Sequence, residues 1–167
     1  FTTQIRKILS EDPATRPVFG GVYASDRLPR HVEAGKRLFI ANTDPADKPG
    51  EHWTAFYFTP NNTCVYFDSY GLPPIVNSFE TFMNNNADRW VYNMKRLQHP
   101  RSILCGHYCI FFALHICRGM KLHEIISLFD NDLRLNDRMM AEFVEHYHGS
   151  KISSLPYTAD CQCTKKP

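Results

Sequence analysis

The sequence lacks the features that mark several special classes of protein. A membrane helix needs about 20 apolar residues, but the longest apolar stretch here runs only from Cys109 to Cys117 and is interrupted by His115. Internal repeats and low-complexity segments are also absent. With 43% hydrophobic and 22% charged residues among 167, the chain is predicted to be an ordinary globular domain with no membrane partner.

A large excess of one charge is missing as well. The net charge is +2 at pH 7, which by itself predicts no nucleic-acid partner. Basic side chains gather in two clusters, for which solvated surface charge is the simpler interpretation and DNA binding the alternative. The clusters are Arg27, Arg30, Lys36 and Arg37, and Arg89, Lys95, Arg96 and Arg101.

The cysteines do not form the even framework that indicates disulfides, and a chain of this size can fold without them. We therefore expect a reducing, intracellular compartment. Two of the three cysteines on one predicted helix would then pack as small hydrophobic side chains. The six cysteines are Cys64, Cys105, Cys109, Cys117, Cys161 and Cys163.

Hydrophobic patterning predicts an α+β fold, in which helices flank a small, mostly antiparallel sheet. A single domain is predicted over residues 1–152, followed by a loose tail over residues 153–167, and the protein is expected to be a monomer. Strands are predicted at 36–42, 51–58, 64–70 and 89–97, and helices at 2–9, 77–84, 105–118, 122–129 and 137–148.

The second and third predicted strands form a hairpin, because the loop between them contains Pro60 and two asparagines. If the turn is centred near Pro60, residues whose numbers sum to about 120 lie opposite each other. His52 and Asp68 meet this condition. Directly opposed residues share a face of the sheet, with Cβ atoms about 5 Å apart. The hairpin therefore predicts an imidazole beside a carboxylate, unless a bulge or a slipped register intervenes.

A Cys-Gly pair at Cys105 opens the long apolar helix. A thiol at a helix N-terminus lies at the positive end of the helix dipole, which favours the thiolate. Gln98 stands seven residues earlier, and its amide is a suitable donor to an oxyanion. Together with His52 and Asp68, these residues supply the nucleophile, the base, the orienting carboxylate and the oxyanion donor of a cysteine protease.

Each of these residue types also has a simpler structural interpretation. A cysteine at a helix start is more often a core residue, a histidine before tryptophan usually packs within a strand, and an aspartate before Ser-x-Gly can belong to a turn. A zinc site is disfavoured because Cys-x₂₋₄-Cys pairs in loops are absent, and a zincin-like helix fails because Ser127 stands where a second histidine is needed. We predict no metal. The rejected metal ligands are Cys105, Cys109, His115 and Cys117, with His107 or the tail pair Cys161 and Cys163.

Five segments carry a resemblance to a known family: 18–23, 40–43, 50–56, 65–71 and 98–112. On these segments the chain resembles adenain, the adenovirus-type cysteine protease, and more distantly the proteases specific for SUMO and related modifiers. The spacing of Gln98, Cys105 and Cys109 matches adenain. In SUMO proteases the glutamine stands six residues before the cysteine, and aspartate commonly occupies the position of Leu104.

The resemblance implies a role for each matching residue. Cys105 would be the nucleophile, His52 its base, Asp68 the residue that orients His52, and Gln98 the oxyanion donor together with the backbone N–H of Cys105. Adenain usually has glutamate where Asp68 stands, whereas SUMO proteases use aspartate.

By the same resemblance, Trp53 and Gly106 would contact the substrate, with Trp53 as a wall of the cleft. The implied activity is that of a thiol endopeptidase that cleaves capsid and core precursors of a virus or virus-like transposon after small, Gly-containing sites. The setting would be the virion and the host nucleus. The alternatives are an isopeptidase for SUMO-like modifiers and an inactive protein-binding module on the same scaffold.

Adenain is activated by a peptide, disulfide-linked to a cysteine eleven residues before the glutamine, and by DNA. Here that position is Ala87, and no cysteine lies between Cys64 and Cys105. Covalent activation by that route is therefore not expected, and no cofactor is predicted. Cys161 and Cys163 could take over such a role, and DNA could act through the basic clusters.

Overall fold

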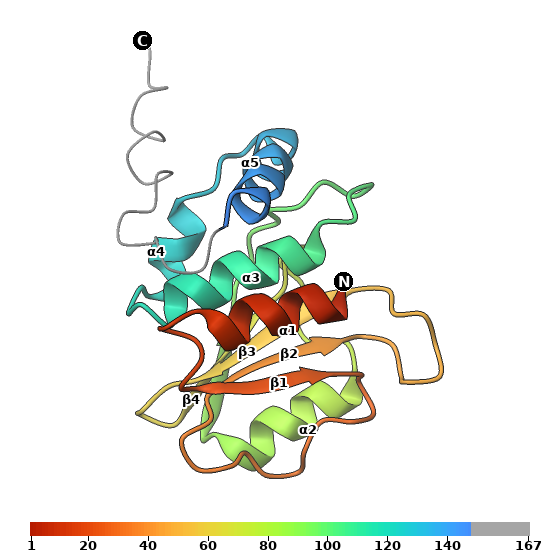
Figure 1. The fold of residues 1–167 in the computed structure, drawn as a ribbon. Coiled ribbons are helices and arrows are strands. Elements are labelled where there is room, and N and C mark those ends of the chain that lie inside the picture. Colours follow the sequence, from red (N-terminus) through yellow and green to blue (C-terminus); the bar gives the residue numbers. More distant parts are fainter. Residues whose placement is uncertain (148–167) are drawn as a thin grey trace.

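Five strands follow one another in space in the order in which they occur in the chain. In the computed structural model, which describes residues 1–147, helices α1 and α3 cover one face of this sheet and α2 covers the other (Figure 1). The strands are β1 (Phe19–Tyr23), β2 (Leu38–Asn42), β3 (Trp53–Phe58), β4 (Thr63–Phe67) and β5 (Arg89–Tyr92). The helices are α1 (Thr2–Glu11), α2 (Asn77–Asn86), α3 (Cys105–Ile116), α4 (Leu122–Ser127) and α5 (Leu133–Glu145).

The α+β class is confirmed, but the sheet is mixed. The pairings β2–β3 and β3–β4 are antiparallel, whereas β1–β2 and β4–β5 are parallel. Parallel neighbours require a long crossover, and α2 lies within the crossover between β4 and β5. Hydrophobic patterns report how deeply a strand is buried but not the direction of its neighbour, so the sheet is less antiparallel than predicted.

The hairpin of β3 and β4 forms with a register that differs from the predicted one. Ala55 pairs with Phe67 and Phe58 with Cys64, so paired numbers sum to 122 rather than about 120. The turn centre shifts because Asn62 adopts a left-handed conformation, with φ of 64°, which asparagine tolerates well. A shift of two in this sum preserves the face on which each side chain lies, because side chains alternate with a period of two.

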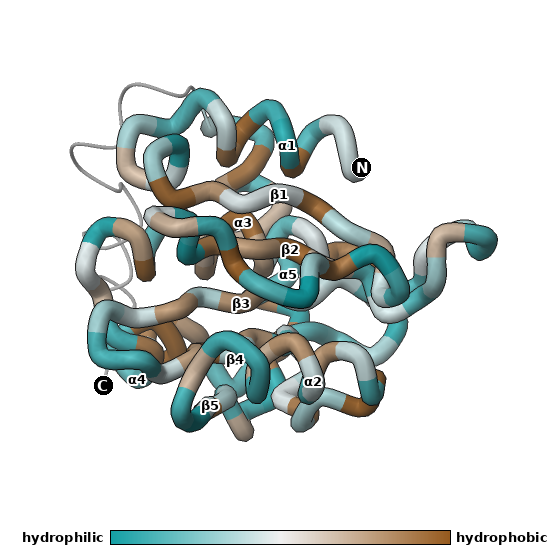
Figure 2. Tube along the Cα trace, turned by 90° about the horizontal axis from the view of Figure 1, so that it is seen from below, coloured by the Kyte–Doolittle hydropathy of each residue, from teal (hydrophilic) through white to brown (hydrophobic). Residues whose placement is uncertain are grey.

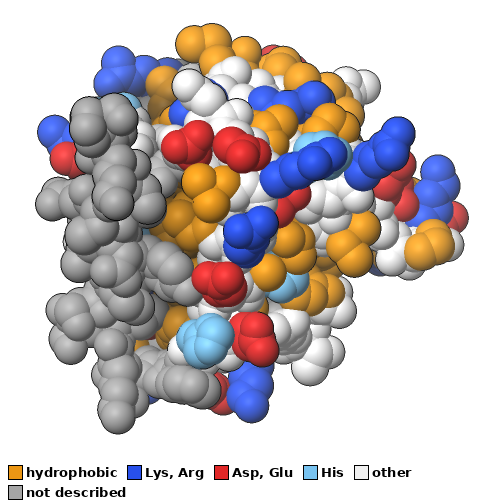
Figure 3. Space-filling model, turned by 90° about the horizontal axis from the view of Figure 1, so that it is seen from above, with side chains coloured by type: hydrophobic (Ala, Val, Ile, Leu, Met, Phe, Trp, Pro, Cys, Tyr) orange, Lys and Arg blue, Asp and Glu red, His pale blue; other side chains and the backbone are white. Residues whose placement is uncertain are grey.

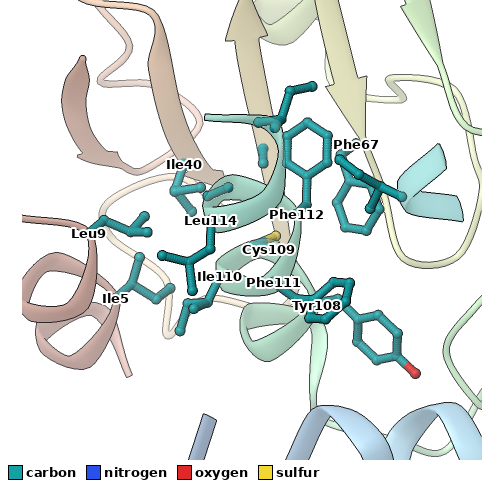
Figure 4. Packing of buried hydrophobic residues seen from close by; sticks show 14 of the residues in the cluster. Ile5, Leu9, Ile40, Phe67, Tyr108, Cys109, Ile110, Phe111, Phe112 and Leu114 are labelled. Carbon is teal, nitrogen blue, oxygen red and sulfur yellow. The ribbon is translucent and has the colours of Figure 1, made fainter. Parts of the chain in front are cut away.

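Helix α3 is buried on nearly all sides. A helix that is apolar all round belongs in a core, and the hydropathy of the chain is high along α3 and the central strands (Figure 2). Ile5 and Leu9 of α1 point toward it, and Phe67 of β4 stacks on Phe112 at 4.6 Å between ring centroids (Figure 4). This packing holds the first residue of α3, Cys105, at a defined position against the sheet.

The opposite face of the sheet carries a second, aromatic core. Phe56 contacts Phe79 and Phe82 of α2 edge-on, at 5.2 and 5.4 Å between ring centroids. Phe39 and Phe58 also meet Phe82 edge-on. Edge-to-face pairs of this kind are a favoured aromatic geometry, and they attach α2 to the sheet.

Helix α5 begins earlier than predicted, at Leu133 instead of residue 137. Asp132 caps it by accepting hydrogen bonds from the N–H groups of Arg134 and Leu135, which is a favoured role for aspartate. Asn136, directly before the predicted start, is buried, and its Nδ2 donates to the carbonyl of Leu97 at 3.0 Å.

Some predictions concern residues outside the described range. The loose tail over residues 153–167, with Cys161 and Cys163, lies there, and so does residue 148 at the end of the last predicted helix. Within residues 1–147, none of the helices combines the length and the apolar character that a bilayer crossing demands.

Candidate active site

His52 and Asp68 lie at adjoining ends of the central hairpin. His52 immediately precedes β3 and Asp68 immediately follows β4. Nε2 of His52 and Oδ1 of Asp68 are 3.0 Å apart, and the two side chains are 13% and 6% exposed. The predicted juxtaposition is therefore present, just beyond the last paired residues. It survives the register difference because the two residues remain on one face and diagonal neighbours are still within reach of long side chains.

Asp68 is held from two sides. Its Oδ1 accepts a 2.7 Å hydrogen bond from the N–H of Tyr70. The Asn93 amide pairs with the backbone of Asp68: Oδ1 of Asn93 accepts from the Asp68 N–H at 3.0 Å, and Nδ2 donates to the Asp68 carbonyl at 2.6 Å. Sequence analysis missed Asn93. The available signal was a lone asparagine directly after the strand 89–92, but its partner depends on the parallel pairing of β4 and β5.

Cys105 acts on the same imidazole. It is the first residue of α3, is buried, and has a free thiol. Burial by itself lowers the pKa of His52, but hydrogen bonds to Asp68 and Cys105, together with the charges of both, raise the pKa of His52 to about 9. Because Nε2 is engaged by Asp68, Nδ1 is the ring nitrogen left for the thiol. The arrangement favours the protonated form of the His52 imidazole.

Gln98 is fully buried beside this site. Its Oε1 accepts a 2.6 Å hydrogen bond from the Ser69 hydroxyl, and its Nε2 donates to the carbonyl and hydroxyl oxygens of Ser102 at 2.9 and 3.2 Å. The amide therefore has a fixed orientation, with its N–H groups toward the loop that leads to Cys105. Sequence analysis missed both serines. In this structure the N–H groups of Gln98 bond to Ser102, and the oxyanion role remains a prediction.

The two predicted substrate contacts lie in different environments. Trp53 is partly exposed at the start of β3 and lines an open hollow of about 450 Å³ together with Tyr23 and Asn42. Gly106 is buried, and the ring of Phe1 fills the space that a Cβ at this position would need. Trp53 is thus available to a bound chain, whereas Gly106 contacts Phe1.

No group of three or more His, Cys, Asp or Glu side chains in residues 1–147 is arranged to hold a metal ion. Of the ligands considered from the sequence, Cys109 and His115 lie within the core. Burial lowers the pKa of His115 to about 4, although its bond to the Phe111 carbonyl opposes the shift. Basic and acidic side chains are interspersed among the described residues on the face opposite α2 (Figure 3).

The sequence of this chain is similar to those of known viral proteases. No protein-family model matches the chain. It is 31% identical over 121 residues to the protease of human adenovirus B serotype 3, an alignment that covers 64% of this chain and 57% of that protein. It is 37% identical over 119 residues to the protease of equine adenovirus B serotype 2, covering 62% and 58%.

The chain thus matches somewhat more than half the length of these curated relatives. Among solved structures, the crystal structure of a protease from ASFV is similar with a TM-score of 0.46 and 20% sequence identity, covering 65% of this chain and 45% of that chain.

Proposed function

We propose, from the homology of this chain to the adenovirus-type cysteine proteases, that it is a cysteine endopeptidase with Cys105 as its nucleophile. One observation carries the proposal: the His52 imidazole is 3.0 Å from the Asp68 carboxylate, and the pKa of His52 is raised by Asp68 and by Cys105. A nucleophile, a base and an orienting group joined in this order constitute the arrangement that nucleophilic catalysis requires.

The chemistry follows from these positions. His52 takes the thiol proton, and the sulfur of Cys105 forms a bond to the carbonyl carbon of the scissile peptide. His52 then gives its proton to the leaving amine nitrogen as the C–N bond breaks, which leaves an acyl-enzyme. Water, activated by His52, attacks the acyl carbon and releases the thiol. Asp68 orients the imidazole and stabilises its positive charge in the steps in which His52 is protonated.

The negative charge that develops on the substrate oxygen needs donors. The backbone N–H of Cys105 lies at the N-terminus of α3, where unpaired N–H groups and the helix dipole favour an anion. Gln98 supplies a second donor if the substrate oxygen replaces Ser102 as the partner of its Nε2. Ser69 holds the amide in the required orientation during that exchange.

The substrates in this proposal are viral or transposon capsid and core precursor proteins, cleaved after small, Gly-containing sites in the virion and the host nucleus. Support comes from the homology to two viral proteases and from the open hollow beside Trp53, which leaves room for an extended chain. The residues at the site perform this reaction without a cofactor.

The test compares two substrates, a peptide with an internal Gly-Gly pair and a folded SUMO-like fusion. Wild-type protein is expected to cleave the peptide, Cys105→Ala is expected to be inactive, and Cys117→Ala is the matched control that should retain activity. Selective cleavage of the fusion would favour an isopeptidase instead. Binding of the peptide without cleavage by the wild type would favour an inactive binding module.

A further inference from the structure

Ile103 stands two residues before the candidate nucleophile and is open to solvent. Among the large apolar side chains of residues 1–147 it is the most exposed, at 90%. Two residues of backbone place its Cα within about 8 Å of the Cα of Cys105. Ile103 belongs to neither of the two hydrophobic cores, and the proposed mechanism does not use it.

Hydrogen bonds on both sides of Ile103 fix the loop that carries it. The carbonyl of Ser102 accepts from Nε2 of Gln98 at 2.9 Å, and the Ser102 N–H donates to the carbonyl of His99 at 2.9 Å. On the other side, the N–H of Leu104 donates to the Ser102 hydroxyl at 3.2 Å, and the Leu104 side chain packs against the core that contains α3. Ile103 is therefore presented outward between two anchored residues.

A side chain presented in this way binds a partner at low entropic cost. Isoleucine is branched at Cβ, which restricts its χ1 rotation, and the loop around it is already ordered. Association therefore loses little side-chain or loop freedom, and the free energy gained by burying apolar area is retained. Single exposed apolar residues are common on protein surfaces, and Ile75, 71% exposed in the segment before α2, is one example. What distinguishes Ile103 is its place beside Cys105.

Ile103 and the hollow beside Trp53 lie on opposite sides of the candidate nucleophile. Residues of β1, β2 and the segment after β2 line the hollow, toward the β1 edge of the sheet. The loop of Ile103 is instead tied to the segment after β4, because Gln98 bonds to Ser69. Helix α3 packs over β3, between the two, and the segments leading from β2 to β3 and from β5 to α3 both extend at the end of the molecule where α3 begins (Figure 1). A chain that lies in the hollow and passes across Cys105 therefore continues toward Ile103.

We infer that Ile103 is a specificity-determining residue of the candidate site, and that it packs against an apolar substrate side chain that flanks the scissile bond on the side away from the hollow beside Trp53. The surface that Ile103 offers is hydrocarbon only. Packing two apolar side chains together removes their area from water, which favours a partner such as leucine over a polar residue of the same size. The inference rests on the proposed function, because it places a substrate across Cys105.

Peptide cleavage measures this preference. The peptide with an internal Gly-Gly pair is made with leucine, or with asparagine of nearly the same shape, at each flanking position in turn. For wild-type protein we expect kcat/KM to be about tenfold higher with leucine than with asparagine at one of the two flanks. Ile103→Ser is expected to bring this ratio close to one by slowing only the leucine peptide, whereas Ile103→Leu should keep it. Ile75→Ser is the matched control, since it removes an exposed isoleucine of another loop and should leave the ratio unchanged.

The inference and the proposed function fail in different ways. A wild-type ratio near one at both flanks, or an equal loss of kcat/KM for both peptides in Ile103→Ser, would overturn the inference, while the cleavage itself would leave the proposed function intact. If the wild type cleaves none of the peptides, the proposed function fails, and fluorescence anisotropy with labelled peptides and Cys105→Ala tests Ile103 alone. Tighter binding of the leucine peptide that is lost when Ile103→Ser is added would support the contact, and equal affinities for the two peptides would contradict it.

Discussion

The Ser69 hydroxyl donates a 2.6 Å hydrogen bond to Oε1 of Gln98, and neither residue is exposed to solvent. The bond joins the residue that follows Asp68 to the residue predicted to stabilise the oxyanion. It determines which end of the Gln98 amide faces Ser102. The orientation of this candidate oxyanion donor is thus set by Ser69, a residue that no local pattern singled out.

Replacing Gln98 by alanine is expected to lower turnover about 10²- to 10³-fold, as loss of one oxyanion donor does. The same change leaves the buried Ser69 hydroxyl without its partner, so we also expect the free energy of unfolding to fall by about 1–3 kcal/mol. Turnover should be measured well below the unfolding temperature, alongside urea denaturation. Ser102→Ala is the matched control, since it removes the 3.2 Å partner of Nε2 and the acceptor of the Leu104 N–H but keeps Gln98 and the Ser102 carbonyl. Equal turnover in Gln98→Ala and wild type would remove Gln98 from the mechanism.

Replacing Asn93 by alanine is expected to destabilise the fold by about 2–4 kcal/mol, because two buried backbone groups of Asp68 lose their partners together. Asn93→Asp keeps the acceptor but loses the donor, so it should cost stability and also place a like charge beside Asp68. Urea unfolding measures the first effect and the rate of Cys105 alkylation the second. Wild-type stability and alkylation in both variants would show that Asn93 does not position Asp68.

Acid is expected to destabilise the protein through His115. Because burial lowers the folded-state pKa of His115 to about 4 from an unfolded value of 6.5, the unfolded state binds the proton more readily. The stability that His115 contributes is present above pH 6.5 and is lost as the pH falls toward 4, by about 3 kcal/mol in total. Urea midpoints at a series of pH values measure this slope. His115→Phe should flatten it, and an equally steep slope in that variant would assign the acid sensitivity elsewhere.

Raising the pH is expected to destabilise the protein through His52. Its pKa is raised to about 9 in the folded state, so its contribution to stability is present below pH 6.5 and is lost as the pH rises toward 9. Chloroacetate is an anion and is attracted to the imidazolium. It should therefore alkylate Cys105 faster below the folded-state pKa of His52, about 9, than above it. Neutral chloroacetamide should show no such fall, and His52→Ala should abolish the difference between the reagents.

The control for this alkylation is Cys117, a partly exposed thiol on the same segment. Burial, and then the charge of Asp12, raises the pKa of Cys117 to about 12, so it should react little at neutral pH. Mass spectrometry of digested protein locates the modified residue. Preferential modification of Cys117 over Cys105 would contradict an activated thiol at the start of α3.

Local patterns were sufficient for much of the secondary structure. The apolar run after Cys105 predicts a buried helix, and its first residue and burial are as expected because such a run has no polar face to expose. The aromatic runs around Pro60 likewise predict the hairpin of β3 and β4. The start of α5 was misplaced, because Asp132 and Asn136 are both plausible caps and only packing makes Asn136 a buried residue.

The amino-acid sequence by itself determined which chemistry is available: the residue types at positions 52, 68, 98 and 105, and the local elements that carry them. The juxtaposition of His52 with Asp68 could also be predicted, because a hairpin joins segments that are close in the chain. A difference of two in the sum of paired residue numbers leaves each side chain on the same face of the sheet. Only the tertiary structure decided what surrounds these groups. Asn93 reaches the site because β5 pairs in parallel with β4, and the turn at Gly71 packs against Lys95. Such contacts join segments far apart in the chain, and no local pattern encodes them.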